Sequence, residues 1–165
     1  MNKVFSILII AIIGLGFVAC NEDFNTMPEP EIKYTSTYPM NGEYWVTYQY
    51  KADGSDFVSG IAKMTLSNTA ANTADSILIY DHDLGFKIKS AVNMDNLTFE
   101  SQSANDYESD EVITVTNGKL FEDAGKTPEN HVTDSIYMEL EFSSAAGDII
   151  ICSGLKETGF NDDNH

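Results

Sequence analysis

The chain has 165 residues, of which 26 are acidic and nine are basic, so its formal net charge is −17 at pH 7. A surface this negative repels nucleic acid phosphates and anionic lipid headgroups, which excludes nucleic-acid binding and membrane attachment through a basic patch. Hydrophobic residues make up 42% of the chain, enough to bury the core of one domain.

The first 19 residues have the pattern of an export signal. A charged start that contains Lys3 precedes an apolar run over residues 4–19, which is short for a helix that spans a bilayer. Ala19 and Cys20 then resemble the end of a bacterial lipoprotein signal, whose cysteine receives a lipid and becomes the first mature residue. The resemblance predicts lipidation of Cys20, removal of residues 1–19 and a membrane anchor. A simple signal peptide and an uncleaved anchor are the alternatives.

Residues 20–39 predict an extended, solvated tether, because they are rich in proline and acidic residues and show no apolar periodicity. Glu22 and Asp23 resemble the signal that sends Bacteroidetes lipoproteins to the outer face of the cell. The resemblance implies an outer-membrane lipoprotein exposed at the cell surface. The alternative is that these two acids simply belong to an acidic tether.

Residues 40–165 are expected to form one β domain. Apolar and polar side chains alternate over residues 42–50 and 134–142, as half-buried antiparallel strands require. In the first of these segments the even-numbered residues are predicted to face inward, which leaves Trp45 outside. Further strands are predicted at residues 57–66, 76–80, 85–92, 96–101, 111–116 and 147–154.

Turn-forming residues separate these strands, and no segment predicts a long helix. The sequence Thr-Asn-Gly at residues 116–118 predicts a turn, and residues 121–131 predict a loop. Eight antiparallel strands joined by short connections predict an up-and-down barrel of the calycin or lipocalin type, with a β-sandwich as the alternative. Gly60 is expected at a bend or bulge of this barrel. Gly42, followed by Tyr44, resembles the opening motif of lipocalins.

Similarity to a known family rests on three segments: NTAANTADSILIYDHDLGFKIKSAVNMDNLTF (68–99), HVTDSIYMELEFSS (131–144) and SGLKETGF (153–160). They resemble a group of Bacteroidetes lipoproteins called lipid-binding putative hydrolases. The resemblance covers most of residues 40–160, and it implies a calycin-like barrel. It identifies no catalytic residues in this chain.

A closed eight-stranded barrel can hold one ligand among apolar and aromatic side chains. The predicted ligand is a small apolar or amphipathic molecule, bound without turnover. The candidates to contact it are the large apolar residues expected to face inward: Tyr44, Tyr48, Met64, Phe86, Phe99, Met138 and Phe142. The alternative is that these side chains fill the barrel completely.

The hydrolase part of the resemblance has little support in the residues. The nucleophile elbow of serine hydrolases is absent, and His82 and His131 are weak candidates for a general base. Cys152 lies in an apolar segment and is expected to be a buried free thiol. Asp81 and Asp83 lie in a turn that could hold calcium. We predict no catalytic residue, no metal site and no cofactor.

The triplet Asp-Ser-Ile occurs twice, with its serines at Ser76 and Ser135. It resembles the acceptor for O-glycosylation in extracytoplasmic proteins of Bacteroidetes, although Asp and Ser also end turns before strands. Three classes of function therefore stay open. They are a lipid-anchored binding protein, an interaction protein with a filled barrel that contacts glycans or envelope partners, and a hydrolase.

Overall fold

The computed structural model describes residues 31–160. The chain divides into two units, Met1–Lys33 and Tyr34–His165, and the strands of the described residues all belong to the second unit. The strands are β1 (Gly42–Tyr50), β2 (Asp56–Asn68), β3 (Ser76–Asp81), β4 (Phe86–Asn93), β5 (Thr98–Asn105), β6 (Val112–Lys126), β7 (Val132–Phe142) and β8 (Ile150–Lys156). Two 3-10 helices accompany them, η2 (Tyr38–Met40) and η3 (Ser143–Ala145).

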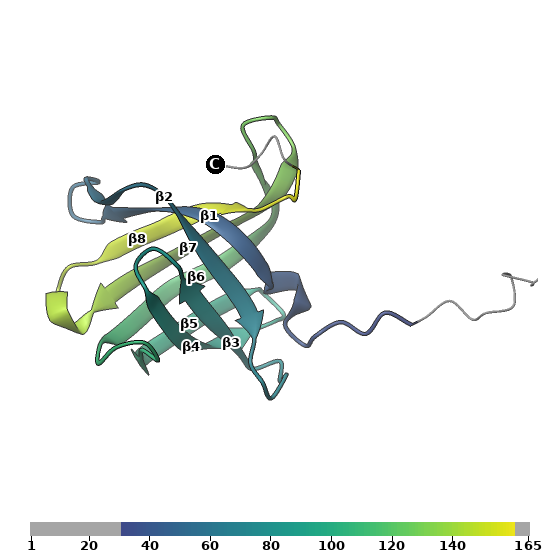
Figure 1. Ribbon diagram of the computed structural model, residues 1–165, viewed down its shortest axis with the longest axis horizontal. Helices are drawn as coiled ribbons and strands as arrows, with labels where there is room; N and C mark the ends of the chain where they lie inside the picture. Colours follow the sequence, from purple (N-terminus) through teal and green to yellow (C-terminus); the bar gives the residue numbers. More distant parts are fainter. Residues whose placement is uncertain (1–30, 161–165) are drawn as a thin grey trace, which may run out of the picture. The chain divides into compact units, whose positions relative to one another are not determined.

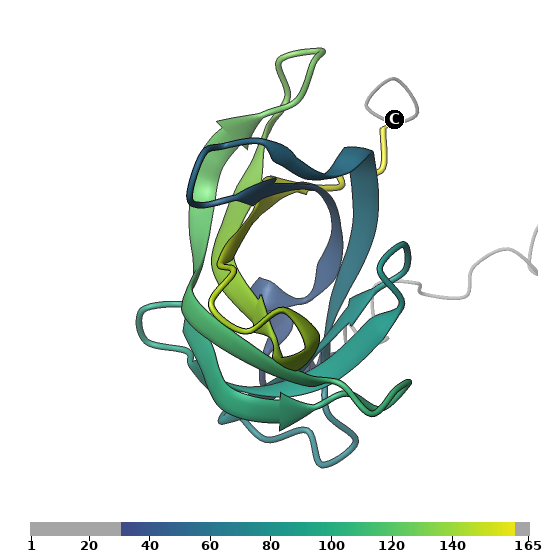
Figure 2. The same ribbon diagram turned by 90° about the vertical axis from the view of Figure 1, so that its left-hand side faces the viewer.

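Each strand pairs antiparallel with the next one in the chain, and β8 pairs with β1 (Figures 1 and 2). The result is a closed, all-β, eight-stranded up-and-down barrel, which confirms the predicted fold class and excludes the sandwich. Closure satisfies the backbone hydrogen bonds of strands that would otherwise form the two edges of the sheet.

Alternation along the strands places one set of side chains inside the barrel. On β1, Tyr44, Val46 and Tyr48 are at most 1% exposed, whereas Trp45 is half-buried and Thr47 is exposed. The predicted facing of β1 is therefore confirmed. The same period of two selects the inward residues of the other strands, among them Met64, Ile79, Ile88, Val115, Met138 and Cys152, which are fully buried.

Gly60 lies at an irregularity of β2, as predicted. The register pairs Val46 with Ala62 but Tyr48 with Val58, so β2 has extra residues at this point. Gly60 has a φ of 94°, which a residue with a side chain adopts only under strain. The extra residues bend β2 at this point.

Strand β6 is longer than the sequence predicts, and it corrects two expectations. Residues 116–118 do not form a turn; Asn117 has a φ of 54° and the register shifts between Thr116 and Lys119, so the segment is a bulge within the strand. The segment predicted as a loop begins with six strand residues, Phe121–Lys126, and leaves only residues 127–131 to connect β6 to β7. Pairing of Phe121, Gly125 and Lys126 with β7 holds this segment in the sheet despite its weak strand propensity.

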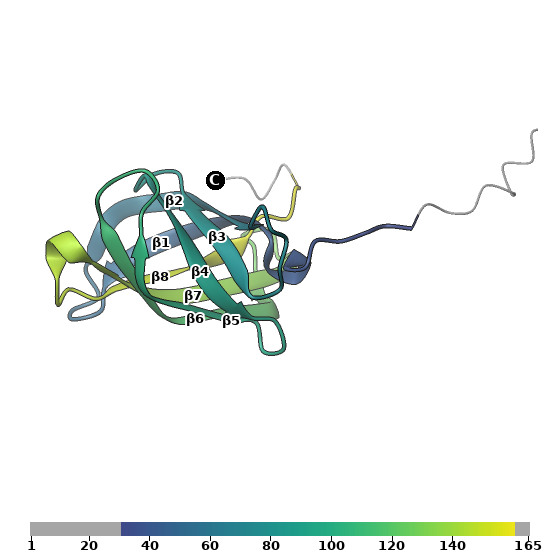
Figure 3. The ribbon, with the colours of Figure 1, turned by 90° about the horizontal axis from the view of Figure 1, so that it is seen from below.

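Helix η2 closes the barrel at the end where β1 begins (Figure 3). Met40 is fully buried there, and the hydroxyl of Tyr44 donates a hydrogen bond of 2.8 Å to the Met40 carbonyl. Ser36 extends this closure, because its hydroxyl donates to the carbonyl of Asn72 in the β2–β3 connection at 2.7 Å. The N-terminal part of the described chain therefore covers one end of the core.

Candidate functional site

The seven residues predicted to contact a ligand belong to the inward-facing set of the barrel. Six of them, all but Phe142, are at most 3% exposed, and Phe142 is partly buried against the same core. They come from β1, β2, β4, β5 and β7, so the closed sheet brings together residues that are far apart in sequence. They line an apolar interior that η2 covers at one end.

The interior also contains a buried polar cluster. The hydroxyl of Tyr48 donates a hydrogen bond to Oδ2 of Asp81, and Oδ1 of Asp81 accepts from the backbone N–H groups of Asp83 and Leu84 at 2.9 and 2.5 Å. Burial raises the pKa of the Asp81 carboxyl, although these hydrogen bonds oppose the change. Burial also raises the pKa values of the Tyr48 hydroxyl and the Cys152 thiol. The cluster therefore places a carboxyl group and a phenol hydroxyl within the apolar core.

Aromatic rings gather at the end of the barrel opposite η2. Tyr50 ends β1, Phe57 is the second residue of β2, Phe86 begins β4 and Phe142 ends β7. The ring centroids lie 5.4 Å apart for Tyr50 and Phe57, 6.1 Å for Phe57 and Phe142, and 5.8 Å for Phe86 and Phe142. Tyr50, Phe57 and Phe142 are only partly buried. This aromatic end therefore presents apolar surface to solvent directly above the core.

Two of the four rings were predicted as ligand contacts, a third was predicted to face inward, and the fourth was missed. Phe86 and Phe142 are among the predicted ligand contacts, and Tyr50 continues the inward face of β1. Phe57 was missed because the second irregularity of the β1–β2 register, between Tyr48 and Gln49, changes the phase of alternation in β2, so counting back from Met64 puts Phe57 on the outer face. This shift arises from pairing with β1 and has no local signal in the sequence.

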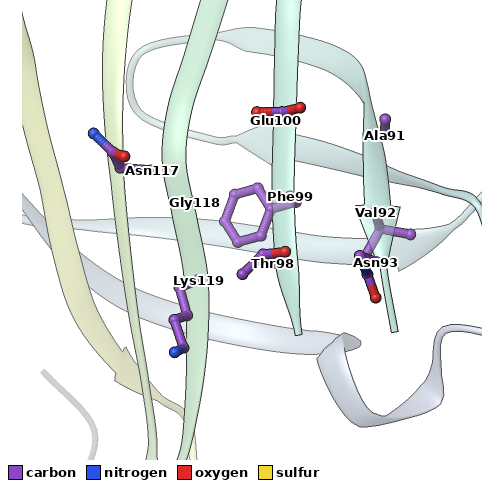
Figure 4. Close-up of a pocket in the computed structure, with 9 residues that line it drawn as sticks. All are labelled: Ala91, Val92, Asn93, Thr98, Phe99, Glu100, Asn117, Gly118 and Lys119. Carbon is purple, nitrogen blue, oxygen red and sulfur yellow. The ribbon is translucent and has the colours of Figure 1, made fainter. Parts of the chain in front are cut away.

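Three cavities of about 550, 530 and 650 Å³ are open to solvent in the described structure. The first lies over β4, β5 and β6, where the ring of Phe99 points toward Gly118 (Figure 4). A Cβ added at Gly118 would be 2.5 Å from a ring carbon of Phe99, so only glycine leaves room for this ring. Of the seven predicted contacts, Phe99 alone lines one of these three cavities.

The second cavity lies beside Pro39, the β4–β5 turn and β6, and the third lies on the outer wall around Trp45. No histidine or cysteine lines any of the three. His82 contacts the hydroxyl of Thr65 through Nε2 at 2.9 Å on the exposed surface, and the ring of His131 lies 4.5 Å from that of Phe160. These positions assemble no hydrolytic site around the three cavities.

Residues 31–160 contain no group of three or more His, Cys, Asp or Glu side chains that could hold a metal ion. In the turn that was expected to be able to hold calcium, Asp81 and Asp83 accept hydrogen bonds from the backbone instead. Asp81 caps the turn from inside, and Oδ2 of Asp83 accepts the backbone N–H of Lys63 at 2.7 Å. The two carboxylates therefore have hydrogen-bond partners within the protein.

The two serines predicted as glycosylation acceptors differ in exposure. Ser76 begins β3, is 4% exposed, and donates a hydrogen bond of 3.0 Å to Asp75. Ser135 is half-buried on β7, where it lines the outer-wall cavity. Attachment of a sugar at Ser76 would have to precede closure of the barrel, since the folded protein covers this hydroxyl.

The sequence matches the family described as lipid-binding putative hydrolase over residues 29–161. The chain belongs to this family. Among curated proteins, none matches the sequence. A lipid-binding role fits the apolar barrel of this member of the lipid-binding putative hydrolases, and the family match supports the resemblance noted in residues 68–99, 131–144 and 153–160.

The predicted signal peptide, Cys20 and most of the tether lie outside the described residues. Within residues 31–160, no helix has the length and apolar character needed to cross a membrane. Cys152 is a buried free thiol, as predicted, and burial raises its pKa, which disfavours the reactive thiolate.

Proposed function

We propose that the barrel binds a small apolar or amphipathic, lipid-like molecule without chemical turnover, and that this molecule enters at the aromatic end. The observation that carries the proposal is the row of four rings, Tyr50, Phe57, Phe142 and Phe86, contributed by four strands above an apolar core. Partly exposed rings that are contiguous with a core form the kind of surface that binding sites for apolar ligands use.

The two ends of the barrel support this direction of entry. Helix η2 covers one end, where Met40 is fully buried and its carbonyl accepts a hydrogen bond from the hydroxyl of Tyr44. At the other end, Phe57 and Phe142 could separate by rotation of their side chains and admit an acyl chain between them. Each buried methylene group would contribute about 0.8 kcal/mol, so an acyl chain could bind without any polar contact.

We also propose that the protein is an outer-membrane lipoprotein exposed at the cell surface and anchored through a lipid on Cys20. Support for this proposal comes from the sequence. The apolar run over residues 4–19 ends in Ala19 and Cys20, and Glu22 and Asp23 follow at once. Such an anchor would hold a lipid-binding barrel beside the membrane that supplies its ligand.

A second candidate function is an interaction protein whose barrel is filled. It is favoured by the burial of Tyr44, Tyr48, Met64 and Met138, which are at most 1% exposed, and by the position of the three cavities, which are open to solvent. Partners would then contact the outer wall or the connecting loops, and no small molecule would enter the core.

Binding of a fluorescent fatty acid tests the proposal. Phe57→Ser removes the central ring of the aromatic end and should weaken binding about tenfold, because one ring contributes about 1.4 kcal/mol to the contact. Phe160→Ser is the matched control, since Phe160 is 57% exposed and lies beside His131 near the β6–β7 loop. Absence of binding by the wild-type protein would contradict the proposed function. Equal affinities of the two variants would contradict entry at the aromatic end.

A further inference from the structure

The outer wall of the barrel contains an apolar groove that the proposed entry at the aromatic end does not use. Its volume is about 650 Å³, within the range of small-molecule sites. Strands β1, β2, β6, β7 and β8 contribute to it, together with Thr127 and Pro128 of the β6–β7 connection. We call this cavity the Trp45 groove. Its other lining residues are Trp45, Thr47, Ile61, Phe121, Lys126, Ser135, Ile136, Tyr137, Ser153, Gly154 and Leu155.

The floor of the groove is apolar. Trp45 and Leu155 are neighbours in the register of β1 and β8, and both are half-buried on the outward face of the sheet. Ile61 is 49% exposed and Phe121 is 40% exposed, so large apolar side chains also face solvent in this groove. Outward positions of a barrel in water are normally polar, and a contiguous apolar patch at such positions marks a binding surface.

The charge of the groove differs from that of the whole chain. The chain has 26 acidic residues, yet no Asp or Glu lines the groove, and its one charged lining residue is Lys126. Lys126 is exposed and forms no ion pair within residues 31–160. Asp134, next to Ser135, is already paired with Lys156 at 3.2 Å. An anion therefore meets less repulsion here than at the acidic surface elsewhere.

We propose that the Trp45 groove binds a free single-chain anionic amphiphile, such as a long-chain carboxylate. The acyl chain lies over Trp45 and Leu155 and between Ile61 and Phe121, and the carboxylate lies at the Nζ of Lys126. This site is separate from the aromatic end, and the proposal stands whether or not a ligand enters the barrel.

The sole tryptophan of the chain makes the groove directly observable. A bromine atom on an acyl chain quenches indole fluorescence when the two are in contact, so 9,10-dibromostearate is the probe. We expect saturable quenching of Trp45 in the full-length protein. The amplitude should persist at high salt while the affinity falls, because Lys126 is exposed and its charge is screened.

Two matched charge reversals test the polar contact. Lys126→Glu should weaken binding of dibromostearate about fivefold, since an exposed ion pair contributes up to about 1 kcal/mol. Lys89→Glu is the control, because Lys89 is an exposed residue on β4 and the net charge changes equally. Ile61→Ser tests the apolar contact in the same way without a change of charge. Equal affinities of the two lysine variants, with Ile61→Ser unaltered, would overturn the proposal.

Comparison with the aromatic end separates the two sites. Quenching of Trp45 that is retained in Phe57→Ser supports the groove, whatever happens to the binding of the fluorescent fatty acid. Binding of the fluorescent fatty acid without any quenching by dibromostearate would overturn the groove and leave the barrel site standing. Saturable self-association that shields Trp45 in the absence of fatty acid would assign the groove to a second copy, and it would also overturn the proposal.

Discussion

Tyr48 on β1 donates a hydrogen bond across the barrel interior to the carboxylate of Asp81 at the end of β3. The two strands are not neighbours in the sheet, because β2 lies between them. The same carboxylate accepts the backbone N–H groups of Asp83 and Leu84 in the β3–β4 turn. One buried side chain thus links a core tyrosine to the conformation of a surface turn.

The raised pKa of Asp81 predicts a particular dependence of stability on pH. A carboxyl group whose pKa is higher in the folded state binds a proton more readily when folded, so its contribution to stability is largest below its ordinary pKa of 3.8. That contribution is lost as the pH rises through the raised folded value. Asp81→Asn keeps the size of the side chain and removes the titration. We therefore expect the stability of the wild type, relative to Asp81→Asn, to decrease from pH 4 to pH 7.

Urea unfolding of both proteins at several pH values measures this difference. Asp83→Asn is the control, since Asp83 lies in the same turn and its carboxylate accepts the backbone N–H of Lys63 at the surface. A constant difference between the wild type and Asp81→Asn over this range would show that the buried carboxyl keeps an ordinary pKa.

The close approach of β1 to Gly154 on β8 predicts that adding a single methyl group here destabilises the fold. A Cβ at this position would lie 2.0 Å from the carbonyl oxygen of Trp45 on β1, and the backbone of β1 cannot rotate away as a flexible side chain would. Gly154→Ala should therefore destabilise the protein by about 3 kcal/mol, the upper part of the range for overpacking. Ser153→Ala, at the adjacent outward position, should change stability by less than about 0.5 kcal/mol. Thermal unfolding followed by circular dichroism compares the two, and similar melting temperatures would contradict the expectation.

The ion pair of Lys51 and Glu139 predicts a modest coupling free energy between these two side chains in the folded protein. Its Nζ–Oε2 distance is 2.8 Å, the Lys51 side chain is 50% exposed, and the Glu139 side chain is 9% exposed. Hydrogen bonding to Lys51 lowers the pKa of Glu139, so the pair stabilises the fold above the ordinary value of 4.5 and loses this effect as the pH falls through the lowered pKa. A double-mutant cycle with Lys51→Met and Glu139→Gln should give a coupling free energy of about 1 kcal/mol at pH 7. A coupling that persisted at pH 2 would rule out this origin.

The proposed lipidation of Cys20 predicts different behaviour of the two cysteines of the chain. Cys20→Ala should incorporate no fatty-acid label in the native host and should leave the membrane fraction, or keep an uncleaved signal. Cys152→Ala should be labelled as the wild type is, because Cys152 is fully buried within the barrel. Metabolic labelling followed by membrane fractionation distinguishes the variants. Label on the Cys20→Ala protein would refute the lipoprotein assignment.

Much of the fold could be predicted from the sequence because half-buried strands carry a local signal of period two. β1 was predicted with its observed bounds, and the inward positions of Tyr44 and Tyr48 followed from alternation alone. The extension of β6 over Phe121–Lys126 could not be predicted in this way. Its strand conformation depends on pairing with β7, which is a tertiary interaction, and its own residues have weak strand propensity.

The candidate sites were predicted less completely, since they depend on contacts between distant strands. Phe142 and Phe86 could be assigned to the interior, but nothing local shows that their rings meet at one end. The Trp45 groove was not predicted, for a related reason. Its apolar residues face outward, and alternation assigns outward residues to solvent without showing that Ile61, Trp45, Leu155 and Phe121 lie together.

Closure of the barrel by its first and last strands has a consequence for how the chain folds. Tyr44 pairs with Lys156, so the final seam joins residues that are 156 − 44 = 112 positions apart. Contacts of such long range form slowly, because most of the chain must be ordered before they contribute. Until β8 pairs with β1 and β7, each of these two strands has an unpaired edge that can pair with strands of other molecules. Synthesis that stops before Ile150 would leave both edges permanently open, and such a fragment would aggregate rather than form a smaller barrel.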